Sequence, residues 1–286
     1  MKTLAEARIA VIGLGLMGGS LAAALRGRCA QIIGFDRRPE TVVHALKLGI
    51  IDTGAPDLQT ALREVDSVVL ATPVRTIIHL LDEIAVHLPD GCLVLDLGST
   101  KAEVLKAMER LPPRVQPLGG HPMCGKEISG IEAADARLFQ GRTFILSPLQ
   151  RTSPEALAQG EALARAVGAT PLVIDGVRQD YLVAAISHLP YLLACALVST
   201  ADATVSADPL VWQIVAGGFR DTSRVAGSDP AMMTDIMLTN RDEVLKALEL
   251  CTAHMEHLTA LVARGDPDEL CAAFGAIRRK RQEMYA

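Results

Sequence analysis

The sequence predicts an α/β protein in which a doubly wound, mostly parallel β-sheet is followed by an all-helical segment. A short apolar run, Ile9 to Ile12, leads directly into a glycine-rich turn and then into a run of good helix formers. Stretches typical of buried strands alternate with helical stretches over about the first 175 residues, and no convincing strand follows Val177. We therefore expect one domain over residues 1–175 and a helical domain over residues 176–286.

Composition and charge narrow the class of protein. Of the 286 residues, 50% are hydrophobic and 21% are charged, as in globular proteins, and a net charge of −5 gives no support for nucleic-acid binding. No uncharged apolar run reaches the ~20 residues of a membrane helix, no signal peptide is visible, and the six cysteines form no Cys-x-x-Cys pair. His254 and His257 have no partners at metal-ligand spacing. We expect a cytoplasmic protein without membrane or metal binding.

The glycine-rich turn has the spacing Gly-x-Gly-x-x-Gly between a strand and a helix, which is the context that gives this motif its meaning. Gly13 allows the tight turn, Gly15 lets the backbone approach a pyrophosphate, and Gly18 lets the helix pack closely on the strand. The free N–H groups at the helix start face the phosphates of a dinucleotide. The sequence therefore predicts a Rossmann-like cofactor site formed by Gly13, Leu14, Gly15, Leu16, Met17 and Gly18.

The residue that follows the second predicted strand, Gln31 to Phe35, selects the cofactor. This residue is Asp36, and it lies near the ~20-residue spacing after the glycine motif at which an acidic side chain binds the adenosine ribose. Its carboxylate would repel a 2′-phosphate, so NAD is favoured over NADP. Arg37 weakens that preference, because an arginine there could bind the phosphate of NADP instead.

Thr72 and Pro73 follow another buried strand, Ser67 to Ala71. In a doubly wound sheet ligands bind at the carboxyl ends of the strands, so the two residues either line the nicotinamide half of the cofactor site or simply end the strand. The other predicted strands are Cys92 to Asp96, Val115 to Leu118, Thr143 to Leu146 and Leu172 to Ile174. The predicted helices include Glu40 to Leu48, Leu58 to Val65, Ile77 to Leu88, Ala102 to Arg110, Pro154 to Val167, Asp180 to Thr200, Pro209 to Val215, Pro230 to Leu238, Arg241 to Arg264 and Pro267 to Arg279.

His121 is the strongest candidate for a catalytic side chain. It follows a predicted strand at the edge of the sheet where the nicotinamide would lie, and histidine is the usual general base near neutral pH. The alternative is a capped surface histidine. Ser99 leaves another strand and opens a helix, so it either caps that helix or bonds to the substrate or the histidine. Lys101 is expected to balance surface charge.

Three side chains in the helical half could bind a substrate. His188 lies on an otherwise apolar helix, where a histidine is more often a satisfied core residue than a ligand, and Pro190 is expected to bend or break the helix there. A predicted glycine-led loop carries Arg220 and Arg224, and the planar fork of an arginine suits a carboxylate. The alternative for these arginines is a surface ion-pair cluster.

These motifs together resemble the prephenate and arogenate dehydrogenases of tyrosine biosynthesis. The resemblance runs in order from Ile9 to about Leu238. It is carried by the glycine motif with Asp36, Gly98-Ser99-Thr100-Lys101, Gly120-His121-Pro122-Met123, Ser187-His188-Leu189-Pro190, Gly218-Phe219-Arg220-Asp221 with Arg224, and Ser228-Asp229-Pro230. The combination is far more specific than a dinucleotide motif alone.

The resemblance implies NAD-dependent oxidative decarboxylation of prephenate to 4-hydroxyphenylpyruvate, or of arogenate to tyrosine. In this reaction His121 would accept the proton of the 4-hydroxyl while C4 gives a hydride to the nicotinamide, and loss of CO2 would aromatise the ring. Ser99 would hydrogen-bond near both groups. Arg224 would hold the substrate carboxylate and His188 would help to position the substrate. Two further residues take their roles from the same resemblance: Arg220 would support the substrate site, and Glu127 matches an acidic position that gates the pocket in some members.

Two departures from the family pattern and two other functions are to be weighed. The serine motif reads Ser-Thr-Lys where Ser-Val-Lys is usual, and Met232-Met233 stands where some members carry a tryptophan. A β-hydroxyacid dehydrogenase would use a lysine on the long helix after the sheet, and the chain has none between Val177 and Thr200. A non-catalytic NAD-sensing module would bind the cofactor without turnover.

The apolar surface of the helical half predicts a homodimer built through it.

Overall fold

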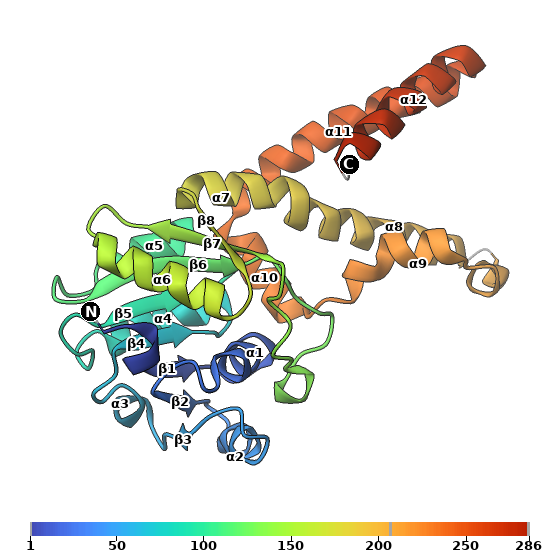
Figure 1. The fold of residues 1–286 in the computed structure, drawn as a ribbon. Coiled ribbons are helices and arrows are strands. Elements are labelled where there is room, and N and C mark those ends of the chain that lie inside the picture. Colours follow the sequence, from blue (N-terminus) through green and yellow to red (C-terminus); the bar gives the residue numbers. More distant parts are fainter. Residues whose placement is uncertain (1, 206–207, 285–286) are drawn as a thin grey trace. The chain divides into compact units, whose positions relative to one another are not determined.

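The computed structural model describes residues 2–205 and 208–284, which form two compact units, residues 1–241 and 242–286. The first unit contains the sheet and the helices up to α10, and the second consists of helix α11 (Arg241–Arg264), which begins at the boundary, and helix α12 (Pro267–Glu283) (Figure 1). The predicted α/β class with a mostly parallel sheet is confirmed. The predicted division between residues 175 and 176 stays a prediction.

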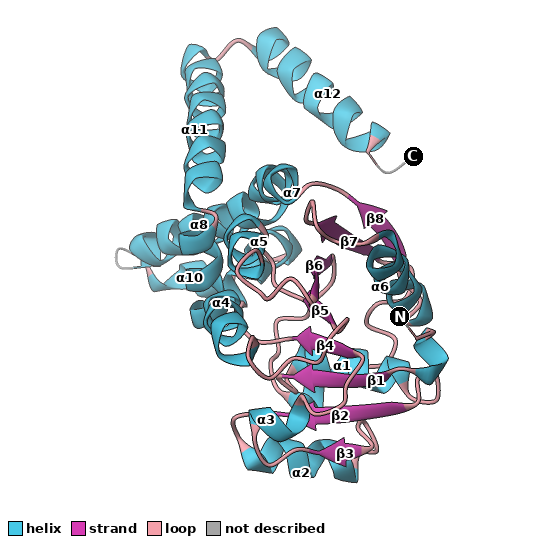
Figure 2. Cartoon of the chain, turned by 90° about the vertical axis from the view of Figure 1, so that its left-hand side faces the viewer, coloured by secondary structure: helices cyan, strands magenta, loops and turns pink. Residues whose placement is uncertain are grey.

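The eight-stranded sheet has the order β3-β2-β1-β4-β5-β6-β7-β8, which can be followed in Figure 2. Every neighbouring pair is parallel except β6 and β7. The first strand has the second on one side and the fourth on the other, so a crevice opens between them at the carboxyl end of the sheet. The strands are β1 (Arg8–Ile12), β2 (Gln31–Phe35), β3 (Thr53–Gly54), β4 (Ser67–Leu70), β5 (Leu93–Asp96), β6 (Gln116–Pro122), β7 (Thr143–Pro148) and β8 (Thr170–Val173).

Both faces of the sheet are covered, which explains the continuous apolar runs of its strands. Ile9 and Val11 of β1 belong to the core on one face, under α1, α2 and α6, whereas Ala10 and Ile12 belong to the core under α3, α4 and α5. This alternation is the period-two pattern of a strand. The helices are α1 (Leu16–Leu25), α2 (Pro39–Lys47), α3 (Leu58–Ala61), α4 (Val74–Ile84), α5 (Ala102–Met108) and α6 (Pro154–Ala166).

The helical part of the first unit differs from the prediction in two places. The long helix is not broken at Pro190: α7 (Gly176–Val183) continues through a π-helical segment, Ala184–His188, into α8 (Leu189–Val205). The wider π turn accommodates the irregularity just before the proline, whose missing N–H would otherwise interrupt the ladder. The predicted glycine-led loop is also helical, because α9 spans Gly217–Ser223. Helix α10 (Pro230–Thr239) ends this unit.

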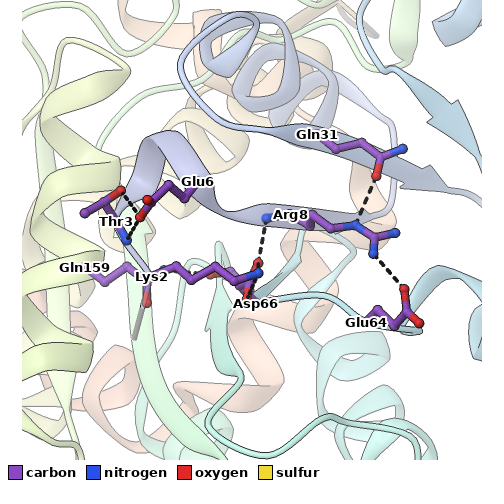
Figure 3. Close-up of polar contacts among 9 residues, drawn as sticks. Lys2, Thr3, Glu6, Arg8, Gln31, Glu64, Asp66 and Gln159 are labelled. Atoms are coloured by element: carbon purple, nitrogen blue, oxygen red, sulfur yellow. Dashed lines mark hydrogen bonds and ion pairs between the residues drawn. The ribbon is translucent and has the colours of Figure 1, made fainter.

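A polar network closes the amino end of the sheet (Figure 3). The Asp66 carboxylate accepts hydrogen bonds from the Arg8 backbone N–H at 2.9 Å and from Lys2 Nζ at 3.1 Å. The Arg8 guanidinium donates to Gln31 at 3.1 Å and to Glu64 at 2.9 Å. These contacts join β1 to β2 and to the segment before β4. Because the contacts of Lys2 and Glu64 are exposed, these two contribute little stability individually.

The expectation that no apolar run reaches the length of a membrane helix is wrong: the helical stretch Gly176–Thr204 is long and apolar enough to cross a membrane, with a mean hydropathy of 1.9 over its most apolar window. Only 22% of that window is buried, and a single helix of this kind is by itself a weak indication of a membrane span. Val177, Tyr181 and Ile186 are each more than 60% exposed along it. The described residues of the first unit therefore leave an apolar face of this stretch uncovered.

The glycine turn gives a direct test of packing between β1 and α1. A Cβ on Gly18 would lie 1.9 Å from the carbonyl oxygen of Gly13, so Gly18→Ala should lower the free energy of unfolding by about 1–3 kcal/mol. Gly15→Ala is the matched control, because a Cβ there meets nothing within 4 Å. Urea unfolding should show a lower midpoint for the first variant alone. Equal midpoints in the two variants would contradict this packing.

Candidate active site

The glycine turn is held between the carboxyl ends of β2 and β4. The Gly13 N–H donates to the carbonyl of Phe35 at 2.8 Å, and a Cβ on Gly13 would lie 2.7 Å from the carbonyl oxygen of Ala71. The φ of Gly13 is +93°, which only glycine adopts readily. Helix α1 begins at Leu16 with Gly15 as its N-cap and with no side chain capping it. The first N–H groups of the helix are thus available to a phosphate.

The Asp36 carboxylate is built into this turn. One oxygen accepts from the Leu14 N–H at 2.9 Å and the other from the Arg38 N–H at 3.0 Å. A cleft of about 580 Å³ lies beside it, lined by Arg38 and, with Asp36, by two further carboxylates, Glu40 and Glu132. Arg37 is exposed and does not line this cleft. The basic side chain beside Asp36 is therefore Arg38, and acidic side chains predominate.

A second cleft, of about 270 Å³, continues from the first toward Ser99, whereas His121 is not among its lining residues. Thr72 and Pro73 line both clefts, as Gly15 and Leu16 do, and the hydroxyl of Thr72 is buried without a partner among the described residues. The members that belong to the second cleft alone include Met17, Ser99, Glu127, Asp229 and Met232. One continuous surface thus runs from Asp36 past the glycine turn to Ser99.

A fully buried carboxylate, Asp96, connects the loop that carries Ser99 to strand β6, which carries His121. Its Oδ2 accepts from the Gly98 N–H at 2.7 Å, and its Oδ1 accepts from the Gly120 N–H at 3.0 Å. Asp96 also forms an ion pair with Lys101, whose side chain is 0% exposed. The expectation that Lys101 balances surface charge is therefore wrong. Burial raises the pKa of Asp96, while Lys101 and the two N–H groups oppose this by favouring the carboxylate.

The amino end of α5 is capped by Asp180 from α7 and not by Ser99. The Asp180 carboxylate accepts from the N–H groups of Lys101 at 2.7 Å and Ala102 at 2.8 Å. Burial raises its pKa to about 6, although these hydrogen bonds favour the ionised form. The neighbouring Gln179 side chain donates to the Ser99 carbonyl at 3.2 Å. The capping alternative for Ser99 is wrong, and its hydroxyl remains at the edge of the second cleft.

His121 is 9% exposed and lies inside β6, one residue before the strand ends, because β6 extends further than predicted. The alternative of a capped surface histidine is wrong. Burial lowers the pKa of His121 to about 3. The positive charge of Lys101 acts in the same direction, as does a charge on His188 when that residue is protonated, whereas a contact with Gln179 opposes them. The Nδ1 atom has no hydrogen-bond partner among the described residues. The imidazole is neutral and can accept a proton.

His188 is 1% exposed and ends the π-helical segment. Its Nδ1 lies 3.2 Å from Asn240 Nδ2, while its Nε2 is buried without a partner among the described residues. Burial lowers the pKa of His188 to about 4. The structure thus brings two neutral histidines, separated by 67 positions (188 − 121), close enough for the charge of one to affect the other.

The two predicted arginines are placed differently. Arg224 forms an ion pair with Glu127, and both side chains are partly exposed at the opening of the site. Arg220 lies on α9, exposed, and makes no ion pair with any residue that the structure describes.

Within residues 2–205 and 208–284 no group of three or more histidine, cysteine, aspartate or glutamate side chains could hold a metal ion.

Several site residues were not found from the sequence: Asp96, Gln179, Asp180 and Asn240. A signal existed for two of them. Asp96 ends a buried strand directly before the Ser99 loop, and Asp180 is a carboxylate on a largely apolar helix. Gln179 and Asn240 carry no signal of this kind, because their roles depend on contacts that only the folded chain creates.

The buried histidines should make the fold sensitive to acid. The unfolded pKa of about 6.5 exceeds the folded pKa of His121, so the unfolded state binds more protons below pH 6.5 and stability falls as the pH falls. In His121→Asn the free energy of unfolding lost between pH 7.5 and 5.5 should be about 1 kcal/mol smaller than in the wild type. Urea unfolding at the two pH values measures this. An identical loss in both proteins would mean that His121 titrates normally.

Comparison with known proteins places this geometry in a family. Residues 21–173 match the family model described as "Prephenate dehydrogenase, nucleotide-binding domain", and residues 176–276 match "Prephenate dehydrogenase, dimerization domain". Prephenate dehydrogenase of Bacillus subtilis is 36% identical over 280 residues, covering 96% of this chain and 76% of the relative. Cyclohexadienyl dehydrogenase of Zymomonas mobilis is 32% identical over 277 residues, covering 96% and 94%.

Solved structures agree with these relatives. Prephenate dehydrogenase from A. aeolicus, in complex with hydroxyphenyl propionate and NAD+, superposes with a TM-score of 0.92 at 33% identity, covering 99% of this chain and 100% of that chain. Synechocystis arogenate dehydrogenase superposes with a TM-score of 0.83 at 30% identity, covering 97% and 99%. Both domain models together span most of the sequence, and the resemblance of the motifs is confirmed. The chain belongs to the prephenate dehydrogenase family.

Proposed function

We propose that this protein catalyses the NAD-dependent oxidative decarboxylation of prephenate, arogenate or both, in tyrosine biosynthesis. The observation that carries the proposal is the neutral, buried His121 near the carboxyl end of β6, whose neighbour Gly120 shares the Asp96 carboxylate with Gly98 of the Ser99 loop. The family membership of the chain and its likeness to a structure bound to NAD+ and hydroxyphenyl propionate support the same reaction.

The residues of the glycine turn fit a dinucleotide. The space above Gly15 is open, the helix N–H groups are uncapped, and the cleft beside Asp36 is large enough for an adenosine moiety. NAD accepts a hydride when bound. We infer that NAD is used in preference to NADP, because three carboxylates, Asp36, Glu40 and Glu132, surround the place where a 2′-phosphate would lie. The proposed cofactor-binding set includes Thr72 and Pro73, which line both clefts.

His121 acts as the general base. Its neutral imidazole accepts the proton of the substrate 4-hydroxyl, and this transfer makes the departure of hydride from C4 favourable. The low pKa of the free site comes from burial and from the positive charge of Lys101. A bound substrate carries carboxylates, whose negative charge raises the pKa of the imidazole and so strengthens the base in the complex. Ser99, which lines the second cleft, bonds the substrate hydroxyl.

Arg224 and Glu127 form the entrance of the substrate site. Because the Arg224 guanidinium is paired with the Glu127 carboxylate, a substrate carboxylate must replace Glu127 to reach it. Glu127 therefore acts as a gate that opens when the substrate carboxylate takes its place at Arg224. Arg220, which is exposed on the neighbouring helix, supports the entrance as a second positive charge. His188 contributes a hydrogen bond from inside the pocket.

Neither alternative function gains support from the structure. Mycobacterium tuberculosis 3-hydroxyisobutyrate dehydrogenase shares the fold with a TM-score of 0.60, but at 16% identity this likeness concerns the fold alone. The lysine that a β-hydroxyacid dehydrogenase would use on the long helix after the sheet is missing, because the sequence has none between Val177 and Thr200. A non-catalytic NAD sensor would show no turnover, so an activity assay distinguishes it from the proposed enzyme.

We also infer that the active form is a cytoplasmic homodimer. The exposed apolar side chains of Val177, Tyr181 and Ile186 lie in the region that matches the dimerization domain, so a second copy would cover them. Light scattering should give a mass of about twice 30.4 kDa. A mass of one chain would contradict the inference.

The test of the reaction is formation of NADH, followed at about 340 nm, with prephenate and arogenate compared side by side and NADP run as the alternative cofactor. His121→Asn should lower kcat by roughly 10²–10⁴-fold, because it removes the base. NAD affinity, measured by calorimetry in the same variant, should be unchanged. Wild-type turnover in His121→Asn would contradict the role of the histidine, and absence of turnover in the wild type would contradict the reaction itself.

A further inference from the structure

Asn240 makes two contacts through the same atom at the end of α10. Its Nδ2 donates to the carbonyl of Asp180 at 2.8 Å and lies 3.2 Å from Nδ1 of His188. Asn240 is 5% exposed and His188 is 1% exposed, so water does not compete for these contacts. The side chain therefore bridges the backbone of α7 and the imidazole at the end of the π-helical segment.

The first of these contacts fixes the orientation of the amide. If the amide were turned over, its oxygen would face the Asp180 carbonyl, and two acceptors would then lie at hydrogen-bond distance. The group near His188 is therefore the NH2, which can only donate. Nδ1 of His188 must accept, so it carries no proton. A neutral imidazole with a bare Nδ1 carries its proton on Nε2.

We propose that Asn240 is a positioning residue that holds His188 as its neutral, Nε2-protonated tautomer, so that His188 presents a hydrogen-bond donor to an oxygen of the substrate. The direction of that donor toward substrate rests on the proposed function. The Nε2 atom is buried and has no partner among the described residues, which is the state of a donor that awaits a ligand. A protonated imidazole is excluded, because its Nδ1–H would face the Asn240 NH2.

The neutral state of His188 also matters for the base. Positive charge on His188 lowers the pKa of His121, so a protonated His188 would make the base weaker. Burial keeps the pKa of His188 low, in agreement with the bare Nδ1. Asn240 thus affects both histidines. It is a hydrogen-bond partner of His188, and by keeping His188 neutral it keeps a positive charge away from His121.

The direct test is the ¹⁵N NMR spectrum of histidine-labelled wild-type protein at pH 7, which distinguishes protonated from bare ring nitrogens, with His188 assigned by its loss in His188→Ala. We expect Nε2 protonated and Nδ1 bare. Asn240→Asp places an acceptor where the donor was, and Nδ1 should become protonated. A protonated Nδ1 in the wild type, or a bare Nδ1 in Asn240→Asp, would overturn the proposal. These spectra require no turnover, so they decide the tautomer even if the proposed reaction fails.

A double-mutant cycle tests whether Asn240 acts through His188. Asn240→Leu should raise KM for prephenate about 5- to 20-fold, as expected for a misdirected buried hydrogen bond. In the His188→Ala background the same change should add less than twofold. Thr239→Ala is the matched control: its hydroxyl joins α10 to Thr100 at 2.8 Å without touching His188, and KM should stay within twofold of the wild type. Additive effects of Asn240→Leu and His188→Ala would overturn the proposal.

Discussion

The buried carboxylate of Asp96 is the constraint on which the geometry of the site depends. It accepts the N–H of Gly98 and the N–H of Gly120, and these residues directly precede Ser99 and His121. Ser99 lies in a loop and His121 in strand β6, and the same side chain sets the position of both. Removing one member of such a buried pair typically costs 3–5 kcal/mol, whereas replacing both members can be neutral. The ion pair with Lys101 therefore specifies geometry more than it adds stability.

Around this pair the chain forms a low-dielectric site in which further buried polar side chains are held in place by hydrogen bonds. Asp180 caps α5, Gln179 holds the Ser99 carbonyl, and Asn240 reaches from the end of α10 to the second histidine. Burial lowers the pKa of both histidines, so both are neutral at physiological pH. A neutral base and a neutral donor are the forms that the proposed reaction needs. The exposed pair of Arg224 and Glu127 lies outside this shell, where exchange with a substrate carboxylate is possible.

The parts of the fold that could be predicted are those that local sequence determines. The glycine motif, the alternation of strands and helices, and Asp36 at the end of β2 follow from short stretches whose pattern carries its own meaning. The antiparallel β7 was not predicted, because strand direction depends on the loop between β6 and β7 and not on the strand itself. Pro190 misled for a related reason, since the π turn before it is visible only in the folded helix.

The candidate site shows the same division. His121, Ser99 and His188 were found because their motifs are local, but their partners lie far away in the sequence. Lys101 was placed on the surface because nothing near it in the chain reveals that it is buried against Asp96. Asn240 meets His188 across 52 positions, and no local pattern indicates such a contact. Positioning residues of this kind are specified by the packing of α7, α10 and the sheet together.

The central claim is that the Asp96–Lys101 pair positions Ser99 and His121 while the cofactor site is held separately. The most direct measurement is kcat together with the NAD dissociation constant in the double variant Asp96→Asn, Lys101→Met, which removes both charges of the buried pair. Asn retains one acceptor but turns an NH2 toward one of the two glycine N–H groups. We expect kcat to fall by at least about tenfold while NAD affinity changes less than twofold. A kcat within twofold of the wild type would contradict it.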